Sequence, residues 1–238
     1  GRGFTKASAG DLILGNGNNR FINFTDGITI NGGAIDFANS ASIAAGALRS
    51  MPVNLGGNTL RYTGGTASNM RFGGLSGPGT LSLGAANSGF EFIATSASSG
   101  ATISGTGFTV RGIKGAVQTL TGNTSGLTGT LAIQGISTLD GAGGSSGGLT
   151  LSGAGNNTFN NATNLFAIRG GKFTIDNTTN NLTNRFPTAA TSGMISFLGG
   201  SFELLGNSAG TAFTIGSGYA TNTKATAFNA GQNNIIIN

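Results

Sequence analysis

The chain of 238 residues contains no cysteine, no histidine and no tryptophan. Nucleophilic sites of the Ser–His–Asp and Cys–His types are therefore impossible, and so are zinc sites built on histidine or cysteine ligands. The lack of cysteine fits an exported bacterial protein that folds without disulfides, although many cytosolic proteins lack cysteine as well. We expect neither a cofactor nor a metal ion from this composition.

Charge is scarce, since only 8% of the residues are Asp, Glu, Lys or Arg and the net charge is +5. The basic residues are spread along the chain, and Arg111 with Lys114 is the closest approach to a cluster. A nucleic-acid-binding domain gathers its basic residues on one face or segment, so we expect no nucleic-acid partner.

Long apolar runs are also missing, because no stretch of about 18 apolar residues exists that would predict a membrane-spanning helix. Collagen is excluded because there are only three prolines and glycine does not recur at every third position. No secretory signal is visible from Gly1 onward, so we expect either a mature form or a fragment of a longer chain.

Glycine is abundant, with 45 residues, and much of the rest is Ser, Thr, Asn and Ala. Such a composition is typical of disorder, but 37% of the residues are hydrophobic and they are spaced regularly along the chain. Short runs in which apolar and polar residues alternate recur every 8–12 residues or so, which predicts an all-β chain. The clearest runs are 11–14, 21–24, 28–30, 34–37, 59–62, 70–72, 80–83, 90–93, 101–103, 108–110, 130–133, 149–151, 165–168, 172–175, 194–197, 201–204, 212–215 and 234–237.

Charged residues inside these runs obey the alternation, since each lies between two apolar neighbours. With a strand period of two, such residues point away from the core, and we expect them on a solvated outer face. They are Asp36, Arg61, Arg71, Glu91 and Glu203. Asn16-Gly17, Asp26-Gly27, Asn31-Gly32 and Asp140-Gly141 could form local hairpins, and Ser40–Ser50 is the only candidate helix.

A pattern of glycine followed by alternating apolar residues returns at steps of about 20–30 residues, the range of solenoid repeats. It is seen at 57–62, 79–83, 129–133, 148–151, 171–175 and 200–204. We therefore predict one domain over residues 1–238, a parallel β-helix (β-solenoid) of about ten coils that rise by ~4.8 Å each.

Several segments resemble the autotransporter-associated β-strand repeat proteins of bacteria. The similarity lies in residues 6–14, 77–83, 148–159, 167–185 and 195–210. The resemblance implies a right-handed β-helical stalk, an extracellular or cell-surface location, a structural or adhesive role, and no catalytic residues.

We therefore expect a non-catalytic extracellular structural protein with no catalytic, cofactor-binding or metal-binding residues. The edge strands of its terminal coils would let copies stack head to tail into a homopolymeric filament or surface stalk. One alternative is an autotransporter-like adhesin that binds polysaccharide or cells. Another is a polysaccharide lyase or hydrolase, for which Asp140 and Asp176 near Arg169 and Lys172 are the candidates.

Overall fold

The computed structural model describes most of the chain. The described residues are 2–14, 26–38, 51–63, 70–83, 90–92, 96–111, 115–134, 147–155, 166–183, 185, 195–212, 227–228 and 234–238. Within these ranges the secondary structure consists of β-strands, no helix occurs, and every strand pair is parallel. The prediction of an all-β chain with parallel strands is confirmed.

The strands form three hydrogen-bonded sheets. The first sheet contains β1 (Gly3–Lys6), β3 (Gly27–Ile30), β5 (Pro52–Asn54) and β8 (Gly74–Ser76). The second contains β2 (Leu12–Leu14), β4 (Ala34–Phe37), β6 (Thr59–Tyr62), β9 (Thr80–Leu83), β12 (Thr102–Arg111), β14 (Gly126–Gln134), β16 (Phe166–Arg169), β18 (Ile195–Leu198) and β20 (Ala227–Phe228). In the same sheet β10 (Phe90–Phe92) also pairs with β12, and β7 (Met70–Phe72) pairs with β10. The third contains β11 (Ala97–Ser99), β13 (Val117–Leu120), β15 (Gly148–Leu151), β17 (Lys172–Asp176), β19 (Ser201–Leu205) and β21 (Asn234–Ile237).

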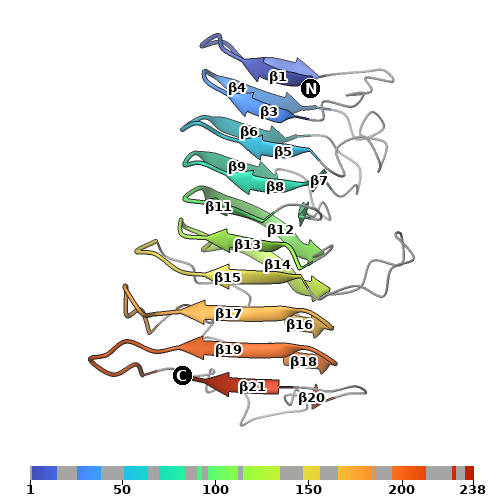
Figure 1. Cartoon of the computed structure of the whole chain (residues 1–238). Coiled ribbons are helices and arrows are strands. Elements are labelled where there is room, and N and C mark those ends of the chain that lie inside the picture. Colours follow the sequence, from blue (N-terminus) through green and yellow to red (C-terminus); the bar gives the residue numbers. More distant parts are fainter. Residues whose placement is uncertain are drawn as a thin grey trace.

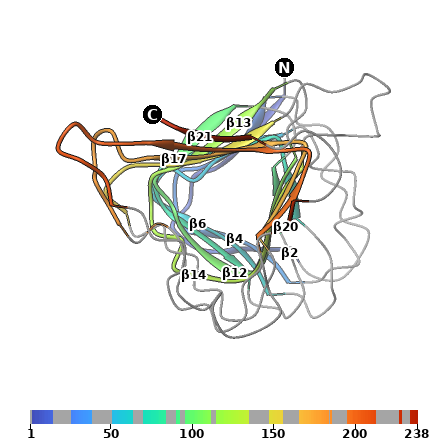
Figure 2. The same ribbon diagram turned by 90° about the horizontal axis from the view of Figure 1, so that it is seen from below.

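The chain visits the sheets in turn, so that neighbouring strands of one sheet come from successive passages of the chain. We call one such passage a layer. Residues that face each other in adjacent layers are separated by 21 positions between Ala97 and Gln118 and by 33 between Ser201 and Asn234. The layers follow one another in sequence order from β1 to β21, with the two ends of the chain at opposite ends of the stack (Figure 1). In the view along the stack, the strands of each sheet lie over one another and the sheets surround a common interior (Figure 2).

The interior is filled by apolar side chains at alternate strand positions, stacked from layer to layer. In the third sheet, Leu149, Phe173 and Phe202 face one another in register, and Leu151, Ile175 and Leu204 form a second such line. All six are buried, and the rings of Phe173 and Phe202 lie 5.8 Å apart between centroids at an interplanar angle of 45°. Each layer therefore gains most of its apolar contacts from the layers directly above and below.

The boundary between the first and third sheets lies between β8 and β11, and we call it the seam. Gln118 of β13 is 2% exposed and reaches past Ala97 to the backbone of β8. Its side-chain carbonyl accepts a hydrogen bond from the Leu75 N–H (2.9 Å), and its amide group donates to the Leu75 carbonyl (3.0 Å) and to the Ala97 carbonyl (3.3 Å). The side-chain amide thus pairs with a backbone group of β8, as a peptide group of a neighbouring strand would.

The corners after the strands of the third sheet also stack closely. A Cβ atom on Gly122 would lie 2.2 Å from the Ala101 carbonyl oxygen and 2.4 Å from that of Gly100, and one on Gly155 would lie 2.4 Å from that of Gly122. Glycine is needed at Gly122 and Gly155 because the backbones of successive corners touch.

We predict that Gly122→Ala lowers the free energy of unfolding by about 1–3 kcal/mol, because the added methyl group forces two corner backbones apart. Gly10→Ala is the matched control, since a Cβ on Gly10 meets nothing within 4 Å. Urea denaturation followed by circular dichroism measures both variants. Equal stabilities for the two would contradict the close stacking of the corners.

Arg185 lies in the loop that follows β17 and is completely buried. Its guanidinium group donates to the Asn177 side-chain oxygen (2.7 Å) and to the carbonyl oxygens of Ser152 (3.1 Å), Gly153 and Asn180 (3.2 Å). Burial lowers the pKa of Arg185, and the negative charge of Asp176 opposes this shift. Arg185 therefore ties the loop after β17 to the corner after β15.

The sequence-based hairpin at Asn31-Gly32 is wrong, because β3 and β4 on either side of it belong to different sheets and both pair only in parallel. Gly27 of the Asp26-Gly27 pair begins β3, which pairs in parallel with β1 and β5. The candidate helix Ser40–Ser50, the run 21–24 and the pairs Asn16-Gly17 and Asp140-Gly141 lie outside the described residues.

Candidate functional site

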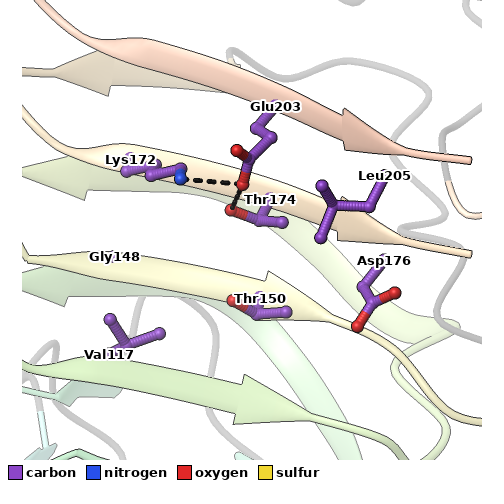
Figure 3. A pocket seen from close by; sticks show the side chains of 8 residues that line it. All are labelled: Val117, Gly148, Thr150, Lys172, Thr174, Asp176, Glu203 and Leu205. Atoms are coloured by element: carbon purple, nitrogen blue, oxygen red, sulfur yellow. Dashed lines mark hydrogen bonds and ion pairs between the residues drawn. The ribbon is translucent and has the colours of Figure 1, made fainter. Parts of the chain in front are cut away.

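A groove runs across the outer face of the third sheet, over β13, β15, β17 and β19. It encloses about 340 Å³, and Figure 3 shows the side chains that line it. They come from Val117, Gly148, Thr150, Lys172, Thr174, Asp176, Glu203 and Leu205. We call it the outer groove.

Strand register explains why these residues meet. Val117, Gly148 and Lys172 face one another in successive layers, and so do Thr150, Thr174 and Glu203. Gly148 has no side chain, and a Cβ atom there would lie 2.9 Å from the Lys172 carbonyl oxygen and 3.5 Å from the Val117 side chain. The groove is therefore a product of layer stacking, since residues more than twenty positions apart in sequence become neighbours only through the parallel pairing.

An ion pair lies at the centre of the outer groove. The Lys172 ammonium group lies 2.7 Å from the Glu203 carboxylate, and the Thr174 hydroxyl donates to the same carboxylate oxygen at 3.2 Å (Figure 3). The Lys172 side chain is 44% exposed and that of Glu203 only 14%. Glu203 is thus held in place by two partners, while Lys172 remains accessible to a ligand.

Asp176 adds a second carboxylate at the edge of the groove. One of its oxygens accepts hydrogen bonds from the Thr178 N–H (3.0 Å) and the Thr178 hydroxyl (2.6 Å), which fixes the side chain in an Asx turn. The lining thus has a formal charge of −1, from Asp176, Glu203 and Lys172, and it contains the hydroxyl groups of Thr150 and Thr174. This arrangement can bind a polar ligand through several hydrogen bonds.

Comparison with known proteins gives no relative. No protein-family model matches the chain, and neither does a curated protein or a solved structure. The kinds of ligand that the outer groove can bind are therefore inferred from its lining residues.

The residues considered for a lyase or hydrolase are only partly brought together. Asp176 and Lys172 both line the outer groove. Arg169 is exposed at the end of β16 in the second sheet and does not line it, and Asp140 lies outside the described residues. Both groove carboxylates are already bound, Glu203 to Lys172 and Asp176 to Thr178. The arrangement differs from a pair of carboxylates that face each other across a substrate.

Sequence reasoning did not single out Thr150, Thr174 and Glu203 as site residues. The signal was present, because the glycine-led segments 147–151, 171–175 and 200–204 place these three residues at equivalent positions when they are aligned. What the alignment cannot show is that these positions open onto a groove.

A second charged cluster lies on the outer face of the second sheet. The Arg61 guanidinium group donates to Asp36 (2.9 Å) and to Asp11 (2.7 Å), and the Thr63 hydroxyl donates to the other oxygen of Asp36 (2.8 Å). These hydrogen bonds raise the pKa of Arg61, and the bond to Asp36 has a larger effect than the bond to Asp11. The prediction that Asp36 is solvated is wrong: its side chain is only 8% exposed because Arg61 and Thr63 cover it.

Other ligand chemistries find little support among the described residues. No group of three or more Asp or Glu side chains gathers there that could hold a metal ion, and no helix there is long and apolar enough to cross a membrane. Tyr62 is completely buried in the core, so it offers no surface for stacking on a sugar ring.

Proposed function

We propose that this chain is a right-handed parallel β-solenoid of about ten coils that acts as a non-catalytic structural element outside the cell or on a bacterial surface. The observation that carries the proposal is the continuous stack of parallel layers from β1 to β21, with apolar side chains along its whole interior. Such a stack gives an elongated, stiff body whose stability comes from contacts between neighbouring layers. A relationship to the autotransporter-associated β-strand repeats is part of this proposal.

We further propose that copies of the chain associate end to end. In β21, Ile235 and Ile237 are 54% and 74% exposed, although they stand in register with the buried core residues Phe202 and Leu204. The outer edge of β21 pairs with no other described strand. At the opposite end of the stack, β1 pairs only with β3, and its inward Phe4 is partly buried against the core. A second copy would place β1 against β21 and extend both the strand ladder and the core.

We predict that the purified chain forms end-to-end rods whose lengths are multiples of about 50 Å, one copy of about ten layers. Ile237→Lys should abolish this association, because it places a charge in the apolar joint. Ile236→Lys is the matched control: Ile236 belongs to the same strand but points to the outer face, in register with Glu203. Negative-stain electron microscopy and sedimentation velocity measure the lengths.

Two outcomes would count against the joint. Monomers at every concentration would contradict end-to-end association while leaving the stacked fold intact. Equal loss of association in both lysine variants would show that the inward positions of β21 are not what joins the copies.

A further inference from the structure

Several hydrogen-bonding groups in the outer groove still have capacity for further hydrogen bonds. Among the described residues, the Thr150 hydroxyl has no hydrogen-bonding partner, and the second oxygen of Asp176 makes no hydrogen bond. Lys172 donates to Glu203 and can donate two further hydrogen bonds. The three residues come from β15 and β17, and their side chains line one hollow in Figure 3.

The groove also offers apolar contact, since Val117 and Leu205 belong to its lining. The aliphatic side chains lie on the outermost strands of the groove, β13 and β19, and the strands between them, β15 and β17, contribute polar ones. Sugars match this pattern because each ring carries hydroxyl groups on its rim and C–H groups on its faces. The strands of the groove follow one another at about 4.8 Å, close to the advance per residue of an extended β-linked glycan.

We propose that the outer groove binds an uncharged oligosaccharide that lies across the strands of the third sheet. Thr150 and Lys172 hydrogen-bond its hydroxyl groups, and Asp176 accepts from a further hydroxyl. The single net negative charge of the groove disfavours acidic glycans, whatever attraction the positive net charge of the whole chain provides. This binding goes beyond the structural role, which does not require it.

Calorimetric and NMR titration of the intact chain with the β-1,4-linked hexamers of glucose and of N-acetylglucosamine tests the proposal. Thr150→Val removes the hydroxyl but keeps the shape, and Asp176→Asn removes the charge while keeping an oxygen that can accept from Thr178. Each should weaken binding by about fivefold, as expected for the loss of one hydrogen bond. Thr29→Val is the matched control, because Thr29 is a partly exposed threonine of β3 outside the groove.

The expected result is saturable binding of at least one hexamer, weakened in both groove variants and unchanged in Thr29→Val. Absence of binding of both hexamers up to about 10 mM would overturn the proposal. Affinities that Thr150→Val and Asp176→Asn leave unchanged would also overturn it, because the glycan would then bind elsewhere. Tighter binding of polygalacturonate or of spermine than of either hexamer would show that the groove selects charge instead of neutral sugar.

Discussion

Replacing Gln118 by methionine is expected to lower the free energy of unfolding by about 3 kcal/mol. Methionine keeps the volume and the flexible shape of the side chain but loses every polar atom that crosses the seam. The Leu75 N–H and carbonyl groups then remain buried without the partners they have at 2.9 and 3.0 Å. A buried backbone group without a hydrogen bond costs about 1–3 kcal/mol, and two such groups are affected.

Urea denaturation measures this loss, and hydrogen exchange at the Leu75 amide locates it, because that amide should become one of the less protected sites near the core. Thr119→Val is the matched control, since Thr119 follows Gln118 in β13 and points to the outer face. A change below about 0.5 kcal/mol in Gln118→Met would mean that β8 and β11 are held together without the side-chain amide.

Arg185→Met is expected to destabilise the protein by about 3 kcal/mol and to loosen the loop after β17. The guanidinium group donates to the Asn177 side chain and to three backbone carbonyls, of Ser152, Gly153 and Asn180, all from inside the folded chain. Methionine fills part of the space but leaves these acceptors buried without donors. Arg185→Lys should recover only part of the loss, because an ammonium group cannot reach all four acceptors as a planar guanidinium does.

Urea denaturation and hydrogen exchange over residues 177–183 measure the effect. Arg169→Met is the control, because Arg169 is an exposed arginine on β16. If Arg185→Met were no less stable than Arg169→Met, the loop would be held by its other bonds, such as that from the Asn177 amide to the Leu182 carbonyl (2.9 Å).

Alternation of apolar and polar residues predicted strands such as β4, β6, β17 and β19, because each has two inward apolar side chains. It missed β5 and β8, which have three residues and a single buried apolar side chain each, Val53 and Leu75. A strand with a single inward apolar side chain shows no alternation that a sequence pattern could reveal. The inward positions of β11 are Ala97 and Ser99, which carry little apolar signal.

The site and the polar contacts of the core depend on which residues become neighbours between layers. Asp36 and Arg61 are 25 positions apart, and nothing in either local sequence indicates that they pair in register. In the sequence, Gln118 looks like an exposed polar residue of a strand. The seam that it bridges lies between two other strands, β8 and β11, so nothing near Gln118 in the sequence indicates its role. Such contacts depend on which residues pair between adjacent layers. The sequence pattern alone determines that register only to within several residues.

The corners of the stack differ greatly in length. Residues 31–33 connect β3 with β4, whereas residues 177–194 separate β17 from β18, yet both pairs of strands stay in register with the neighbouring layers. A deletion of one residue within a strand would turn the following side chains to the wrong face. Corners can therefore absorb insertions and deletions that strands cannot. Gain or loss of a whole layer changes the length of the molecule by about 4.8 Å, so this architecture can evolve in length without redesign of the layers that remain.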